Sequence, residues 1–341
     1  MPIILHHNDD DGRCSAAVIY NECVRGRYMM DPAQCVEWVH GMPAPRLDVS
    51  ELHSDDTVYI VDLALDDDIL SCIADVLQHR KDLKIVHIDH HITSVNRYAK
   101  MKAIRSNDLN DPSNLYLKYV KNLFMVGYSA TLLCWAYAAF DENEREDLAN
   151  VKFDFADQVS HVLIDGLPNS NRYREVRIPM VLRYIDDYDV WRRALDPNTE
   201  YFHYAFFGVS GKDDVMGDLW SGLIYNQDLR VVETFLQAGE AITRYMKANS
   251  KSMMRNAFVS SIDGIEVLCL NGYGNSSVFG EEIKNYPACC IFHYDGQHHN
   301  WKYSMYSDNE KGIDVAQICE SHGGGGHVHA AGFSAQEMIF T

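Results

Sequence analysis

The sequence has no Cys-x-x-Cys pair, although its 341 residues include nine cysteines. Several of these cysteines, among them Cys72, Cys134 and Cys269, stand in apolar segments. That placement is typical of reduced thiols rather than of a disulfide framework. The first residues contain no positively charged leader, and no apolar run approaches the ~18 residues that a membrane helix needs. Together these absences predict a cytoplasmic protein that does not span a membrane.

Basic residues are also scarce, since 30 Lys and Arg stand against 49 Asp and Glu and give a formal net charge of −19. Long nucleic acids and anionic membranes bind clustered Lys and Arg, so neither is expected as a partner. Small anions are not excluded, because a local basic pocket can hold a few phosphates. Disorder is not expected either, because the hydrophobic fraction of 47% and the charged fraction of 23% are ordinary for a globular protein.

Acidic and imidazole side chains stand where three apolar, strand-like runs end. Residues 3–12 read Ile-Ile-Leu-His-His-Asn-Asp-Asp-Asp-Gly, residues 58–62 end in Asp62, and residues 85–91 end in Asp89-His90-His91. Strand patterns alternate with helix patterns, which predicts an α/β fold with a doubly wound, mostly parallel sheet. Ligands bind such sheets at the carboxyl ends of the strands, so the three ends would meet in one place.

In the first of these stretches Asp9 and Asp11 stand one residue apart, next to Gly12. On a tight turn both carboxylates can converge on a pair of divalent cations, while Gly12 lets the backbone bend. The alternative is an Asp-rich surface turn. An EF-hand is excluded, because Val18 stands where the last position of that loop requires Glu.

The order of these motifs resembles that of the DHH phosphoesterase superfamily, named after the Asp-His-His that stands here as Asp89-His90-His91. The resemblance covers nearly the whole chain. Its other motifs are Asp9-Asp10-Asp11-Gly12, Asp62, Tyr128-Ser129-Ala130-Thr131, residues 183–191 and Gly323-Gly324-Gly325-Gly326-His327. It implies a DHH domain over residues 1–210, a helical linker over 211–255 and a smaller α/β DHH-associated domain over 256–341.

The resemblance also implies roles for single residues. The metal ligands would be His6 or His7, Asp9, Asp11, Asp62, His90 and Asp187, with Asp62 bridging two cations. Asp189 would support Asp187, while Asp186 and Asp165 are its rivals. Asp89 would orient the imidazoles and His91 would face the substrate phosphate, so the catalytic roles fall on His91, Asp62 and Asp89. Carboxylates with a minority of imidazoles suit manganese, or else magnesium, better than zinc.

The glycine run near the end of the chain has two interpretations. As a backbone nest, Gly324, Gly325 and Gly326 would turn N–H groups toward a substrate phosphate, and His327 would add a donor. Alternatively, the run is a flexible connector. Val328 and His329 replace an Arg and an Asn that many relatives carry, and Tyr306 replaces an Arg.

Periodicity predicts the remaining elements. Helices are expected over residues 14–20, 69–77 (capped by Asp66, Asp67 and Asp68), 129–140, 146–164 (ended by Asp165 and Gly166), 228–255, 276–283 and 314–318, with a further one opened by Pro179. Further strands are expected over 35–39, 257–262, 265–270, 288–294 and 301–307, and an insertion or lid over 97–127.

The function that the resemblance implies is two-metal hydrolysis of phosphoester bonds in short oligonucleotides, dinucleotides or nucleotide phosphates. A RecJ-like single-strand exonuclease is one alternative, which the acidic charge disfavours. Hydrolysis of inorganic polyphosphate or pyrophosphate is another, and aromatic side chains that stack a base would argue against it. A catalytically silent regulatory protein is the third, although every metal motif retains its acids. The expected partner is a small nucleotide, and a homodimer is compatible with the sequence.

Overall fold

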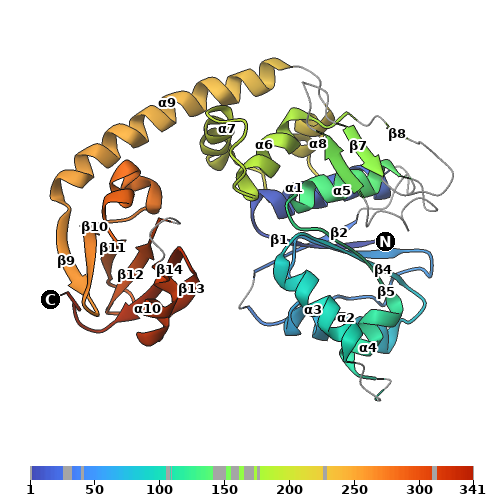
Figure 1. Ribbon diagram of the computed structural model, residues 1–341. Helices are drawn as coiled ribbons and strands as arrows, with labels where there is room; N and C mark the ends of the chain where they lie inside the picture. The colour runs from blue at the N-terminus through green and yellow to red at the C-terminus, as the bar shows by residue number, and fades with distance from the viewer. Residues whose placement is uncertain are drawn as a thin grey trace. The chain divides into compact units, whose positions relative to one another are not determined.

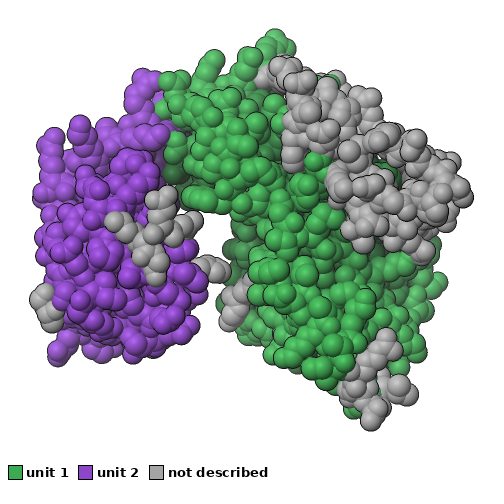
Figure 2. All heavy atoms as spheres, in the orientation of Figure 1, with its two compact units in different colours: residues 1–240 green, residues 241–341 purple. Residues whose placement is uncertain are grey.

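The computed structural model describes residues 2–25, 33–39, 42–104, 108, 110–140, 151–154, 161–164, 173–174, 177–225, 229–308 and 313–340. The chain divides into two compact units, residues 1–240 and residues 241–341 (Figures 1 and 2). This division falls inside helix α9, Leu229–Met253, which occupies much of the predicted linker.

Unit 1 is built on a five-stranded sheet in the order β2-β1-β3-β4-β5. Its strands are β1 (Ile3–His7), β2 (Gln34–Trp38), β3 (Thr57–Val61), β4 (Lys84–Asp89) and β5 (Val120–Phe124). Every neighbouring pair is parallel. The predicted parallel α/β sheet is therefore confirmed, and the ends of β1, β3 and β4 lie side by side.

Helices cover both faces of this sheet (Figure 1). The core on one face includes α1 (Asp10–Ile19), α5 (Ala130–Ala139) and α6 (Met180–Asp189), and the core on the other includes α2 (Asp67–His79), α3 (Ile92–Ala103) and α4 (Pro112–Tyr119). Successive strand side chains point to opposite faces, so Ile4 and Val61 enter the first core, and Leu5 and Ile60 enter the second. The sheet is doubly wound, as predicted.

Two segments of unit 1 differ from their predictions. Residues 97–127 are not an insertion, because they contain the end of α3, all of α4 and the edge strand β5. The helix predicted over 146–164 is wrong as well: β6 (Val151–Asp154) and β7 (His161–Ile164) form an antiparallel sheet with β8 (Tyr173–Arg174). Val-Lys-Phe-Asp in β6 alternates apolar with polar residues, which is the period of a strand. Asp165 and Gly166 lie outside the described residues.

Several predicted helix boundaries are confirmed. Asp66 caps α2 and accepts the N–H of Ile69 at 2.8 Å, Ser129 precedes α5, and Pro179 precedes α6. The helix at the start of the chain continues as a π-helical turn, Tyr20–Val24. Unit 1 also contains α7 (Asn198–Phe207) and α8 (Asp218–Tyr225), and α9 runs through Gly239 without a break.

Unit 2 contains a mixed six-stranded sheet in the order β13-β14-β12-β11-β10-β9. Its strands are β9 (Phe258–Ile262), β10 (Ile265–Asn271), β11 (Ala288–Asp295), β12 (Asn300–Tyr306), β13 (Gly325–His327) and β14 (Ala330–Ala335), and α10 (Val315–Ser321) packs on them. The helix predicted over 276–283 is two 3₁₀ segments, Ser276–Val278 and Gly280–Asn285, because Gly280 has a left-handed φ of 53° that an α-helix does not contain. Within the described residues, none of the helices has the length and apolar character needed to cross a membrane.

Candidate metal centre

Asp62 directly follows β3 at the carboxyl edge of the sheet of unit 1. It is 2% exposed, and its backbone N–H donates to the carbonyl of Ile88 on β4 at 3.0 Å. Its φ of 55° is left-handed, a conformation that costs a non-glycine residue free energy but that Asp tolerates better than most. This backbone turn holds the carboxylate at the edge of the sheet, where the strand ends predicted a ligand site.

The first motif forms the start of α1 rather than a free turn. Asp9 is the N-cap and accepts the N–H of Gly12 at 2.8 Å, while Asp11 lies in the first helical turn. A Cβ added to Gly12 would lie 2.5 Å from the carbonyl oxygen of His7. Gly12 is therefore required for the close approach of α1 to the end of β1, and the predicted bending role is wrong.

The N-terminus of α5 holds Asp11 in place. The N–H groups of Ala130 and Thr131 donate to its two carboxylate oxygens at 2.8 and 2.9 Å. A carboxylate at this position is favoured by the unpaired N–H groups and by the helix dipole. The Tyr-Ser-Ala-Thr motif thus serves to orient a carboxylate of the first motif.

Among the residues that the structure describes, three overlapping groups of side chains could each hold a cation. They are His7, Asp9 and Asp62; Asp11, His90 and Asp189; and Asp62, Asp89, His90 and His91, and within each group the ligand atoms lie within 4.8 Å of one another. Asp62 and His90 each belong to two groups. These side chains come from the ends of β1, β3 and β4, the start of α1 and the end of α6.

The two oxygens of Asp62 face different imidazoles. Oδ2 lies 3.9 Å from Nδ1 of His7, and Oδ1 lies 3.2 Å from Nε2 of His90. Nδ1 of His7 also contacts Oδ2 of Asp9 at 2.6 Å. Nε2 of His90 lies 3.4 Å from Oδ2 of Asp189 and 3.8 Å from Oδ2 of Asp11. Asp62 therefore stands between two sets of ligands.

Asp89 is fully buried and accepts hydrogen bonds from two side chains. Nδ1–H of His91 donates to Oδ1 at 2.7 Å, and the hydroxyl of Ser94 donates to Oδ2. Ser94 in turn accepts the N–H of Leu65 at 2.7 Å. His91 keeps 42% of its side chain exposed. In this arrangement Asp89 fixes the orientation of the His91 ring.

The structure separates the two histidines of the first motif. His6 is 1% exposed, its Nδ1 contacts the carbonyl of His7 at 2.8 Å, and burial lowers the pKa of its imidazole. It belongs to none of the three groups found among the described residues, whereas His7 belongs to one. Because neighbouring strand residues point to opposite faces, only one of the two can face the carboxylates.

The placement of Asp187 differs from its prediction. Its carboxylate accepts the N–H groups of Ala194 at 2.9 Å and Leu195 at 3.0 Å and the hydroxyl of Thr199. These donors occupy the carboxylate inside unit 1, and Asp187 is in none of the three groups. Asp189, predicted only to support Asp187, instead belongs to one of these groups, with Asp11 and His90. The rival Asp186 accepts the N–H of Ser129 and a hydrogen bond from Arg192.

The crowding of carboxylates changes their protonation. Burial raises the pKa of Asp62 well above its usual value, and the charges of Asp11 and Asp9 raise it further. Burial, with Asp11 next in effect, raises the pKa of Asp189 to about 9. Burial is the largest single effect on Asp9 and would raise its pKa, but the hydrogen bond and charge of His7, together with hydrogen bonds from the Gly12 N–H and with Asp62, lower the pKa to about 2. Cations would relieve the repulsion among these acids, so the residues present fit a pair of divalent metals.

We expect the metal-free protein to lose stability as the pH rises from 5 to 9. The pKa values of Asp62 and Asp189 are higher in the folded chain than the unfolded value of 3.8, so in this range the folded state binds more protons than the unfolded state. The contribution of these two carboxyl groups to the free energy of unfolding is therefore fully present at low pH and is lost as the pH rises toward 9. Asp9 has a lowered pKa and contributes equally throughout this range.

Melting temperatures across this pH range measure the effect. Saturating Mn²⁺ should flatten the decline, because bound cations stabilise the ionised carboxylates. Asp189→Asn should flatten it without metal. The same slope in all three samples would show that these carboxylates do not carry the pH dependence.

The glycine run does not form the predicted nest over its whole length. The N–H groups of Gly323 and Gly324 donate to carbonyls of α10, those of Glu320 at 3.0 Å and Cys319 at 2.8 Å. Both therefore cap α10, and the anion-binding role predicted for the N–H of Gly324 is wrong. Residues 325–327 pair with β14 as strand β13. A substrate contact by Gly325, Gly326 or His327 stays a prediction, and the His327 side chain lies outside the described residues.

Sequence reasoning did not place Asp189 among the candidate ligands, and it missed the support that Ser94 gives to Asp89. A signal for Asp189 was present, since it is the last residue of α6, where a carboxylate is unfavourable next to the negative end of the helix dipole. An acidic residue at this position does not stabilise the helix, so its presence indicates another role. Ser94 had no such signal, because it is an ordinary serine in the first turn of α3.

No protein-family model matches the chain, and no curated protein matches it either. Among solved structures, the DHH domain of a member of the s1p family of ribosomal proteins matches 98% of this chain and 82% of its own chain, with 14% identity and a TM-score of 0.54. RecJ from Thermus thermophilus in complex with Mn²⁺ matches 98% of this chain and 49% of its own chain, with 13% identity and a TM-score of 0.43. The pGpG-specific phosphodiesterase PggH from Vibrio cholerae matches 98% of this chain and 93% of its own chain, with 13% identity and a TM-score of 0.44.

The first of these likenesses shows the fold. The chain shares the fold of that DHH domain, with a five-stranded parallel sheet in unit 1 and a mixed sheet in unit 2. The resemblance read from the motifs is confirmed at the level of the fold.

Proposed function

We propose that the protein is a metal-dependent phosphoesterase that hydrolyses nucleotides or short oligonucleotides with two divalent cations. The observation that carries the proposal is the position of Asp62, whose two oxygens face two separate sets of ligands, one with His7 and one with His90. A shared carboxylate between two such sets is the arrangement that a two-metal site requires.

The donor set favours manganese, with magnesium as the alternative. His7, Asp9, Asp62, Asp11, His90 and Asp189 would hold the pair, so four carboxylates and two imidazoles are available. Cysteine belongs to none of the groups in the described parts of the chain. Hard oxygen donors with few imidazoles suit manganese or magnesium, whereas zinc sites favour His and Cys.

Two bound cations would lower the pKa of an attacking water and neutralise the phosphoryl oxygens. The protein's own residues would position the cations and the substrate, and one of them, His91, would donate a hydrogen bond to the phosphate. Burial is the largest single effect on His91 and would lower its pKa, but the hydrogen bond to Asp89 and the charges of Asp89, Asp11 and Asp9 together raise the pKa. With Nδ1–H held by Asp89, Nε2–H is available to donate to a phosphoryl oxygen.

A substrate panel tests the proposal. Dinucleotides, a nucleoside 3′,5′-bisphosphate, a long single-stranded DNA, pyrophosphate and polyphosphate would be incubated with Mn²⁺, with Mg²⁺ and with EDTA. We expect the short nucleotides to be hydrolysed with Mn²⁺ and not with EDTA, and the long strand to be a poor substrate because of the acidic charge. Metal binding without turnover of any phosphoester would instead identify a regulatory protein.

His91→Gln should lower kcat by roughly ten- to hundredfold, the value of one charge-assisted hydrogen bond in the transition state. The affinity for Mn²⁺ should change far less than kcat, because His91 is assigned to the substrate phosphate and not to a cation. His79→Gln, a change at an exposed histidine at the end of α2, is the control. If His91→Gln instead weakens Mn²⁺ binding tenfold or more, His91 is a ligand and not a donor.

A further inference from the structure

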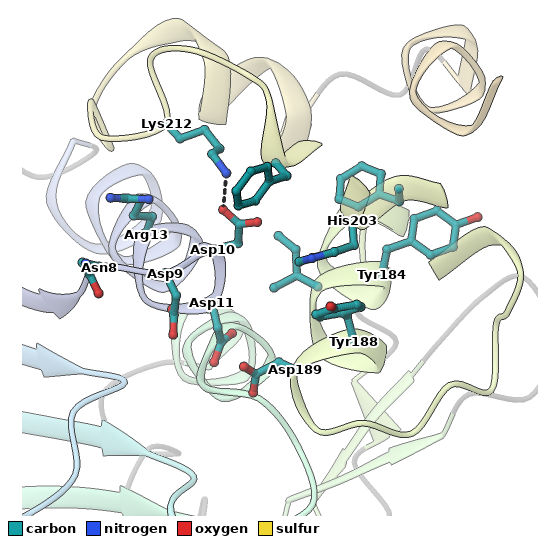
Figure 3. A pocket seen from close by; sticks show the side chains of 13 residues that line it. Asn8, Asp9, Asp10, Asp11, Arg13, Tyr184, Tyr188, Asp189, His203 and Lys212 are labelled. Atoms are coloured by element: carbon teal, nitrogen blue, oxygen red, sulfur yellow. Dashed lines mark hydrogen bonds and ion pairs between the residues drawn. The ribbon is translucent and has the colours of Figure 1, made fainter. Parts of the chain in front are cut away.

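A cavity of about 390 Å³ lies in unit 1 directly beside the carboxylates (Figure 3). Its size falls in the range of small-molecule sites. Asp9, Asp11 and Asp189 form one wall and belong to the candidate metal centre. A molecule whose phosphate lies at that centre can therefore extend into the cavity without leaving unit 1.

The wall opposite these acids is aromatic. Tyr188, on α6, stacks on His203, on α7, with ring centroids 3.5 Å apart and planes at 8°. Tyr184 and Phe202 also line the cavity. Burial lowers the pKa of the His203 imidazole to about 4, so the stacked ring is neutral at neutral pH. Flat, neutral rings of this kind bind planar ring systems by stacking.

Phe207 lies at the end of α7 and also lines the cavity, yet 74% of its surface is exposed. An exposed phenyl ring at the rim of a cavity adds nothing to the core of unit 1, whereas it can cover a ring bound inside.

The two basic residues of the cavity are already paired. Nζ of Lys212 contacts Oδ1 of Asp10 at 2.7 Å (Figure 3), and Nε of Arg13 donates to Oε2 of Glu37 at 2.8 Å. Their charges are therefore largely offset, and the cavity is not built to attract a second phosphate. Asp10 and Asn8 still offer polar atoms to a sugar hydroxyl or a base edge.

We infer that this cavity binds the nucleoside part of the substrate, with the base against the aromatic wall and the phosphate at the carboxylates. The inference rests on the proposed phosphoesterase function and narrows it. If the cavity binds a nucleoside, the substrates are nucleotides. Inorganic polyphosphate and pyrophosphate are then poor substrates, because neither has a ring that could occupy the cavity.

Binding of AMP, UMP and ribose 5-phosphate tests the inference by calorimetry in saturating Mn²⁺. Each nucleotide should bind roughly five- to hundredfold more tightly than ribose 5-phosphate, the range expected for stacking one base on aromatic side chains. Phe207→Ala should reduce that ratio at least threefold, and His203→Leu should reduce it as well. Tyr245→Ala is the matched control, since Tyr245 on α9 is 72% exposed and does not line the cavity.

Each outcome decides one question. Equal affinity for nucleotides and ribose 5-phosphate, or an unchanged ratio in both cavity variants, overturns the nucleoside pocket even if the protein hydrolyses phosphoesters. Base-dependent binding that both variants weaken, in a protein that hydrolyses no phosphoester, supports the pocket and overturns only the proposed function.

Discussion

Asp62→Asn is expected to lower kcat by more than about a thousandfold, because a carboxylate that bridges two cations would contribute several kcal/mol and each 1.36 kcal/mol is a factor of ten. Asn keeps one carbonyl oxygen but loses the charge and the second acceptor. It is a better choice than Ala, since residue 62 has a φ of 55°, which Asn tolerates. Steady-state kinetics with the best substrate of the panel would measure the loss, and calorimetry would count the bound Mn²⁺.

The fold should survive this substitution. Burial and the neighbouring carboxylates raise the pKa of Asp62, so its charge opposes folding in the metal-free protein. The melting temperature without metal should be unchanged or higher. Asp67→Asn is the control, because Asp67 is 92% exposed at the start of α2 and lies outside the three groups. A variant that still binds two Mn²⁺ with kcat within tenfold of the unmodified protein would show that Asp62 does not bridge.

Asp187→Asn and Asp189→Asn should have opposite effects. Asp187→Asn turns an amide N–H₂ toward one of three donors, so the folded state should lose about 1–3 kcal/mol. That loss lowers the melting temperature by roughly 2–12 °C in a unit of this size. Asp189→Asn removes a ligand and relieves repulsion, so Mn²⁺ affinity should fall at least about tenfold while the metal-free protein melts no earlier.

Thermal melts and Mn²⁺ titrations on both variants separate the two roles. The reverse pattern, in which Asp187→Asn loses metal affinity and Asp189→Asn loses only stability, would restore Asp187 as the ligand. It would require the carboxylate of Asp187 to exchange three donors inside unit 1 for a cation.

The sheet of unit 1 was predictable because each of its central strands is a short apolar run that ends in a polar residue. The run around Ile60 and the run around Ile88 are buried on both faces, which gives a continuous apolar pattern. Strand β5 was missed, since Val-Lys-Asn-Leu-Phe at the sheet edge carries polar residues and reads as irregular. The run around Phe153 was misread as a helix because its apolar residues fit both periods over so few positions.

The candidate site was predictable where its residues end strands or follow β1 directly at the start of α1, and not where they lie on α6 and α7. The ends of β3 and β4 place Asp62 and His90, and the order of a parallel sheet brings them together. Asp187 and Asp189 stand two positions apart on α6 and therefore on nearly opposite faces, so the choice between them depends on which face of α6 packs into the core. The short apolar pattern of this helix did not settle that choice. The stack of Tyr188 on His203 joins two helices and leaves no local pattern.

Anomalous scattering from crystals grown with Mn²⁺ would test directly whether Asp62 bridges two cations. We expect two manganese peaks, roughly 3.5–4 Å apart as in other two-metal sites. One peak should contact His7 and Asp9, the other Asp11, His90 and Asp189, and Asp62 should contact both. A single peak, or two peaks that do not share Asp62, would contradict this expectation.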